Sequence, residues 1–108
     1  MLTGQTHTVA FKAPCWLYAG KGAWYFVTLP PESAAEISYF SKALNGGKRV
    51  GWGSVRVTVQ IGATVWQTSL FPDSKNKSYL LPLKAAVRKT ENIIEGKSIE
   101  VKVSLPMP

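Results

Sequence analysis

The sequence predicts a mainly β domain with two short helices, and three observations support this fold class. Residues 55–61 and 99–105 alternate strictly between apolar and polar side chains, the pattern of strands that bury one face. Leu-Pro pairs at 29–30 and 81–82 each end an apolar strand and precede a segment with helical spacing. Hydrophobic residues make up 45% of the chain and charged residues 18%, which suits a single folded domain over residues 1–108.

The first half of the chain contains two predicted strands and a helix. Residues 5–18 predict a strand that is broken or bulged near Pro14, because proline cannot donate to a central ladder. Residues 24–29 predict a strand that is apolar on both faces, so we expect it to lie between a barrel interior and a covering element. A helix then begins at Pro30-Pro31 and ends at 45–47. Its apolar residues are spaced to share one face: Ile37, Phe40 and Leu44.

The second half begins with the clearest strand, at 55–61, where four apolar residues point inward. Arg56 is its only charged residue, and we expect it to point outward; the alternative is a bond across the barrel through Gln60 or Glu100. Gly62-Ala63 marks a tight turn or bulge. Strands at 64–71 and 78–81 follow. Pro82 then opens a helix whose buried stripe is formed by Leu83 and Val87, with Ala86 as a further candidate, and the last strand lies at 99–105.

The order of elements is repeated along the chain, in half-repeats at roughly 24–61 and 78–105. The Leu-Pro pairs lie 52 residues apart, and the two alternating strands lie 44 residues apart. The repeat predicts a pseudo-two-fold barrel with the two helices capping opposite ends. Such a barrel closes within one chain, so we expect a monomer.

The charge balance favours a polyanionic partner. Thirteen Lys and Arg residues face six Asp and Glu residues, for a formal charge of +7, although the basic residues are dispersed. Trp52 lies between two glycines and follows two basic residues, so it could stack on a base or an apolar ligand, or pack as a lid over the barrel mouth. We expect Trp16, Trp24 and Trp66 to be core residues. The candidate nucleic-acid-binding residues are Lys48, Arg49, Trp52, Lys84, Arg88 and Lys89.

Catalytic and metal-binding patterns are missing from the sequence. The only cysteine, Cys15, and the only histidine, His7, lie in one predicted strand, and neither a phosphate loop nor a dinucleotide motif occurs. We therefore expect no enzymatic activity, metal or cofactor. A lone cysteine and an N-terminus without a secretion signal predict a cytoplasmic protein. No run approaches the roughly 18–20 apolar residues of a membrane span, so we expect no membrane partner.

Three segments resemble a bacterial family known as domain of unknown function 1905. They are FVTLP at 26–30, SVRVTVQIGATVWQTSLFP at 54–72 and YLLPLKAAVRK at 79–89. The resemblance implies a double-split β-barrel and no established activity; some relatives are fused to a domain linked to bacteriocin protection. The C-terminal half is also similar to the swapped-hairpin barrels of the AbrB and MazE type, with Lys97 where that family usually has Asp.

The AbrB-like half implies DNA binding by two symmetric basic halves, but here the halves differ in charge. The 52-residue offset places Glu32 opposite Lys84 and Glu36 opposite Arg88, which disfavours a symmetric duplex complex. We therefore expect a non-enzymatic binding or accessory module of unknown ligand. The alternatives are a nucleic-acid-binding module, a small-ligand pocket at the barrel mouth with Trp52 as its lid, and a module that binds a partner protein.

Overall fold

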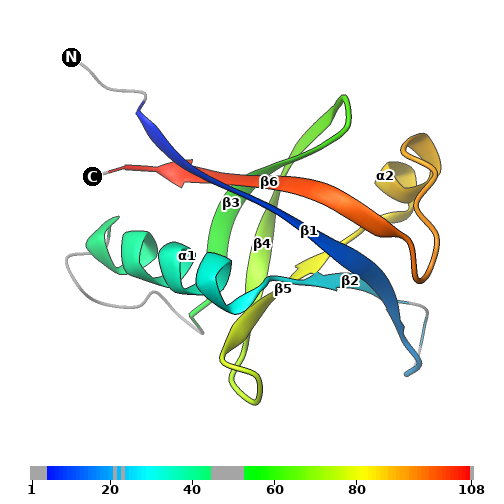
Figure 1. Ribbon diagram of the computed structural model, residues 1–108, viewed down its shortest axis with the longest axis horizontal. Coiled ribbons are helices and arrows are strands. Elements are labelled where there is room, and N and C mark those ends of the chain that lie inside the picture. Colours follow the sequence, from blue (N-terminus) through cyan, green and yellow to red (C-terminus); the bar gives the residue numbers. More distant parts are fainter. Residues whose placement is uncertain (1–4, 21, 23, 45–52, 108) are drawn as a thin grey trace.

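Six antiparallel strands form a closed barrel accompanied by two helices in the computed structural model, which describes residues 5–20, 22, 24–44 and 53–107 (Figure 1). Around the barrel the strands run β1-β2-β5-β4-β3-β6. The predicted fold class, mainly β with two short helices, is confirmed. The elements are β1 (Thr6–Tyr18), β2 (Trp24–Thr28), α1 (Pro31–Leu44), β3 (Val55–Ile61), β4 (Thr64–Asp73), β5 (Ser78–Pro82), α2 (Ala85–Thr90) and β6 (Ser98–Pro106).

Two long strands, β1 and β4, each divide their length between two partners. From Thr6 to Pro14, β1 pairs with β6, and from Cys15 onward it pairs with β2. Similarly, β4 pairs with β3 as far as Leu70 and with β5 from Phe71. The sequence predicts a break or a bulge near Pro14. In the structure β1 continues through Pro14, and the proline lies where β1 changes its pairing partner from β6 to β2. This arrangement is the double split that the family resemblance implies.

The strictly alternating strands supply the centre of the core. Their apolar residues are buried in both β3 and β6, and Val59 pairs with Val103 in the middle of the sheet with neither side chain exposed. Arg56 is exposed on the outer face of β3, as the sequence predicts. The interior is filled by large side chains that are less than 2% exposed: Leu29, Ile37, Leu70, Leu81, Leu105, Val27, Val59, Val101, Val103 and Cys15.

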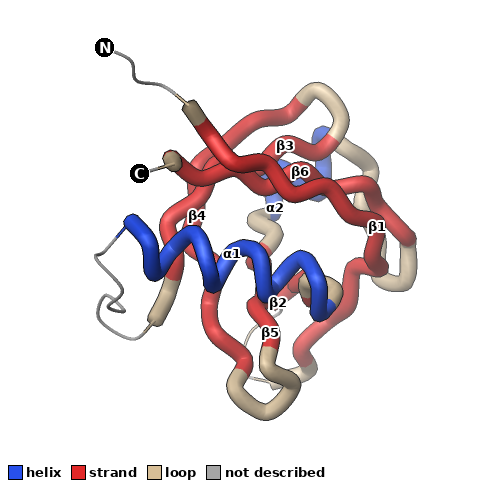
Figure 2. Tube along the Cα trace, turned by 60° about the vertical axis from the view of Figure 1, so that its left-hand side comes forward, coloured by secondary structure: helices blue, strands red, loops and turns tan. Residues whose placement is uncertain are grey.

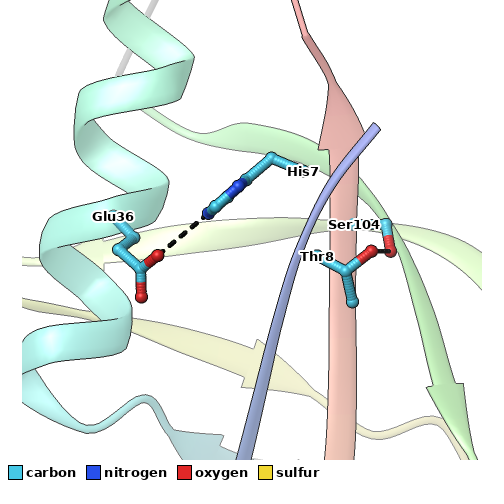
Figure 3. A network of polar contacts seen from close by, with 4 residues as sticks. All are labelled: His7, Thr8, Glu36 and Ser104. Atoms are coloured by element: carbon cyan, nitrogen blue, oxygen red, sulfur yellow. Dashed lines mark hydrogen bonds and ion pairs between the residues drawn. The ribbon is translucent and has the colours of Figure 1, made fainter. Parts of the chain in front are cut away.

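Helix α1 contacts β1, β5 and β6 and buries the face that carries Ala34 and Ile37. The His7 Nε2 atom lies 3.0 Å from the Glu36 carboxylate (Figure 3). The His7 ring also stacks on Phe40, with 3.9 Å between the ring centroids. These contacts fasten the helix to β1. Along the predicted apolar face, burial decreases from Ile37, which is fully buried, through Phe40, which is half-buried, to Leu44, which is exposed.

Helix α2 is shorter than predicted and begins at Ala85. Pro82 does not open it, because Pro82 still belongs to β5, where it pairs with Phe26. Leu83 and Val87 are buried as predicted, whereas Ala86 is exposed.

The order strand, strand, helix, strand occurs twice along the chain. In Figure 2, α1 crosses in front of the ring of strands and α2 lies behind it. The pseudo-two-fold symmetry and the capping role of the helices stay predictions.

Candidate aromatic and basic binding site

A pocket of about 290 Å³ lies where the barrel wall is split between β4 and β5. β4 pairs with β5 only from Phe71 onward. On that side, the preceding part of β4 therefore borders the start of α2, while its other side pairs with β3. Trp24 and Trp66 come to this pocket from β2 and β4, and Lys84 and Arg88 come from the start of α2 and from α2 itself. The lining is completed by Tyr25, Gln67, Thr68, Pro82, Leu83 and Ala85, and none of the lining residues that the structure describes is acidic.

Arg88 is held in place by two contacts of its guanidinium group. The guanidinium carbon lies 3.9 Å from the centre of the Tyr25 ring, and the Nε–H donates to the Leu83 carbonyl at 3.1 Å. The Leu83 N–H in turn donates to the Tyr25 carbonyl at 2.9 Å, which joins the start of α2 to β2. Arg88 therefore has a structural role, while its remaining N–H groups stay available to an anion.

Trp24 presents an exposed ring beside this pocket. Its side chain is 56% exposed and stacks on Phe26 at 6.4 Å between ring centroids, and Phe26 lies 5.3 Å from Trp16. The prediction that Trp24 is a core residue is wrong. Trp24 and Phe26 share the outer face of β2, opposite the buried Val27, and no element that the structure describes covers Trp24. Trp66 and Trp16 are half-buried, so the core prediction holds for them only in part.

The cations around the pocket are not neutralised by neighbouring carboxylates. Ten of the thirteen Lys and Arg residues are described, all except Lys21, Lys48 and Arg49, and none of these ten forms an ion pair with another described residue. The one contact of salt-bridge geometry in the described part of the chain is the hydrogen bond between His7 and Glu36, which involves no Lys or Arg. The positive charge at Lys84 and Arg88 is therefore available to an anionic ligand.

The predicted binding residues are brought together only in part. Lys84 and Arg88 line the pocket, and Lys89 lies with Arg88 in an adjoining hollow next to Ile94. Lys48, Arg49 and Trp52 lie outside the residues that the structure describes, so the nucleic-acid role predicted for these three and the lid role predicted for Trp52 stay predictions.

Sequence reasoning missed the aromatic part of the site, formed by Trp24, Tyr25 and Trp66. The available signal was the alternation within β2. Because Val27 is inward, Trp24 must face outward at the start of the strand, next to a glycine turn.

Cys15, the only cysteine of the chain, is buried in the core and does not line this pocket. Burial raises the pKa of the thiol, an effect that Arg88 opposes and Glu95 reinforces. A buried thiol with a raised pKa is unreactive at neutral pH. Among the described residues, no group of three or more His, Cys, Asp and Glu side chains is placed to hold a metal ion. Neither helix in the described ranges has the length and apolar character needed to cross a membrane.

A family model described as Domain of unknown function (DUF1905) matches residues 11–103. The chain belongs to this family. The match covers β2 to β5 in full, parts of β1 and β6, and all residues of the aromatic and basic pocket. No curated protein matches the chain. The DUF1905 family carries no assigned activity in its description, so the function has to be argued from the pocket itself.

Proposed function

We propose that this DUF1905 protein is a non-enzymatic binding module, and that its aromatic and basic pocket binds single-stranded nucleic acid. The observation that carries the proposal is the exposed Trp24 ring next to Lys84 and Arg88, with no carboxylate in the lining. Proteins that bind single strands combine aromatic rings, on which bases stack, with a basic groove that follows the phosphates.

The geometry favours an unpaired strand over a duplex. A base can stack on Trp24 only if its face is free, and the bases of a duplex are already stacked on one another. The pocket is also small, at about 290 Å³, which suits one or two bases and not a duplex groove. The +7 charge of the chain adds a long-range attraction to any polyanion.

The test is fluorescence anisotropy with labelled single-stranded and double-stranded oligonucleotides at low salt. Trp24→Ala removes a ring worth about 1–3 kcal/mol per stacked base, so binding of the single strand should weaken by about fivefold to more than a hundredfold. Tyr39→Ala is the matched control, because Tyr39 is 68% exposed on α1 and does not line the pocket. Lys84→Gln should reduce the slope of log affinity against log salt by about 0.7.

Two results would refute this function. One is the lack of any single-strand binding by the wild-type protein at low salt. The other is an equal loss of affinity in Trp24→Ala and Tyr39→Ala, because stacking at the pocket would then contribute nothing specific.

A second candidate function is the docking of a partner protein on the outer face of β1, β2 and β4. Tyr18 is 52% exposed and Phe71 is 48% exposed, and both belong to the same sheet as Trp24. Aromatic side chains are enriched at the centres of protein interfaces. A partner bound there should lose affinity with Phe71→Ala and show little dependence on salt, which separates it from nucleic-acid binding.

We also propose that the protein acts as a cytoplasmic monomer. The barrel closes within one chain through the pairing of β1 with β6, and Cys15 is a free, buried thiol. Light scattering at micromolar concentration should give the mass of a single chain; a dimer would contradict the monomer proposal.

A further inference from the structure

A second hollow lies on the outer face of β3, β4 and β6, beside the C-terminal part of α1. It has a volume of about 490 Å³, and its lining combines hydroxyl, amide and guanidinium groups with the apolar residues Leu44, Val55, Val57 and Pro106. None of the lining residues that the structure describes is acidic. We call it the hydroxyl groove, and its polar residues from the strands and the segment before β3 are Ser54, Arg56, Thr58, Gln67, Ser69 and Ser104.

Strand register places these groups in rows across the sheet. Arg56 pairs with Ser69, and Thr58 lies between Gln67 on β4 and Ser104 on β6. Ser104 shares a hydrogen bond of 2.8 Å with Thr8 on β1, which fixes the far side of the groove (Figure 3). The valines that alternate with Arg56 and Thr58 are buried, so the polar groups are held on rigid strands and not on a loop.

Among the described residues that line the hydroxyl groove, Arg56 is the one cation. Its side chain is exposed and forms no ion pair with a described residue. A guanidinium group presents five N–H donors in a fixed fork that fits phosphate oxygens. The surrounding hydroxyls can donate to phosphate oxygens and can both donate to and accept from sugar oxygens.

Gln67 lines both the hydroxyl groove and the aromatic and basic pocket, so only β4 separates the two. Arg56 lies on β3 opposite Ser69, two residues along β4 from Gln67, so a strand that crosses β4 at Gln67 passes from the pocket at Trp24 to the groove at Arg56. We propose that the two hollows form one continuous track for a single-stranded nucleic acid, with bases at Trp24 and the backbone at Arg56. This inference rests on the proposed function and extends it to a site of at least about four nucleotides.

The experiment compares affinities for a length series of oligouridylates and oligothymidylates, from dinucleotides to about eight nucleotides. Arg56→Gln should leave dinucleotide binding unchanged, because a dinucleotide occupies the pocket at Trp24 alone. It should weaken binding of the longest oligonucleotide by about tenfold, the usual effect of losing a charge-assisted hydrogen bond, and reduce the salt slope by about 0.7. Arg56→Lys should recover the salt slope but not the full affinity.

Lys75→Gln is the control, because it removes the same charge from the exposed turn between β4 and β5, outside both hollows. We expect it to change the affinity for the longest oligonucleotide by no more than about twofold. As a second measurement on the wild-type protein, the amide NMR signal of Gln67 should shift with short and long oligonucleotides, and those of Thr58 and Ser104 only with long ones.

The outcomes separate this inference from the proposed function. If long oligonucleotides bind and Arg56→Gln has no effect, or weakens dinucleotides equally, the continuous track is refuted and the pocket at Trp24 still stands. If no oligonucleotide of any length binds, both proposals fail.

Discussion

Arg88 makes a measurable prediction about how α2 is held against the barrel. Arg88→Met keeps an unbranched apolar side chain in place of the methylene part of arginine but removes the charge over Tyr25 and the donor to the Leu83 carbonyl. A cation–π contact contributes about 0.5–2 kcal/mol, and a hydrogen bond from a charged group about 1.5–3 kcal/mol. Since Arg88 is partly exposed, we take values near the lower ends and expect a loss of about 2 kcal/mol.

Urea unfolding followed by tryptophan fluorescence measures this loss. For a domain of this size, about 2 kcal/mol lowers the midpoint by about 1–2 M urea. The urea midpoint of Arg88→Lys should lie between those of the wild-type protein and Arg88→Met, because lysine keeps a cation near Tyr25 but lacks the planar donor that reaches the Leu83 carbonyl. A change of less than about 0.5 kcal/mol in Arg88→Met would refute the structural role of Arg88, because that is the range of an ordinary surface substitution.

Three further predictions concern the barrel itself. Val103→Ala should lower the free energy of unfolding by about 2–3 kcal/mol, because Val103 is fully buried opposite Val59; a loss below about 1 kcal/mol would contradict the packing described. Gly62→Ala should cost about 1–2 kcal/mol, because Gly62 has φ of +58° and the added methyl meets the Glu91 carboxylate that accepts from Thr64; an unchanged urea midpoint would be inconsistent with this turn. Because burial raises the pKa of Cys15 above its ordinary 9.0, the folded state binds this proton more tightly, so stability is full below pH 9.0 and falls as the pH rises through the raised pKa. Wild-type stability should therefore fall more steeply than that of Cys15→Ala above pH 9.0, and parallel curves would contradict a buried thiol.

The parts of the fold that alternation controls could be predicted from the sequence. A strand with one buried face must place every second residue inward, so the inward valines of β3 and the outward Arg56 follow directly from the pattern. The beginning of α2 could not be predicted in this way. Pro82 is compatible with both a helix start and the end of a strand, and its pairing with Phe26 decides between them.

The aromatic part of the candidate site shows the same limit. Trp24 and Trp66 are apolar residues in predicted strands, and the expectation that such residues are buried is right for Val27 but not for Trp24. The pocket exists because β4 leaves β5 at Phe71, a long-range feature of strand pairing that no local pattern in the sequence expresses. Lys84 and Arg88 could be singled out by charge, but their aromatic neighbours depend on the split of the barrel.

The pairing of the first strand with the last has a consequence for biosynthesis. β1 pairs with β6 over nine residues, and the Met107 N–H donates a backbone hydrogen bond to the Gln5 carbonyl. The first strand of the barrel to be synthesised therefore pairs with the last one. During translation β1 presents this edge unpaired until β6 has left the ribosome, and the barrel cannot close before then. The same closeness of the two ends means that a short linker can join them and new ends can be opened in the exposed turn at residues 74–77, giving a permuted chain in which β1 and β6 are made consecutively.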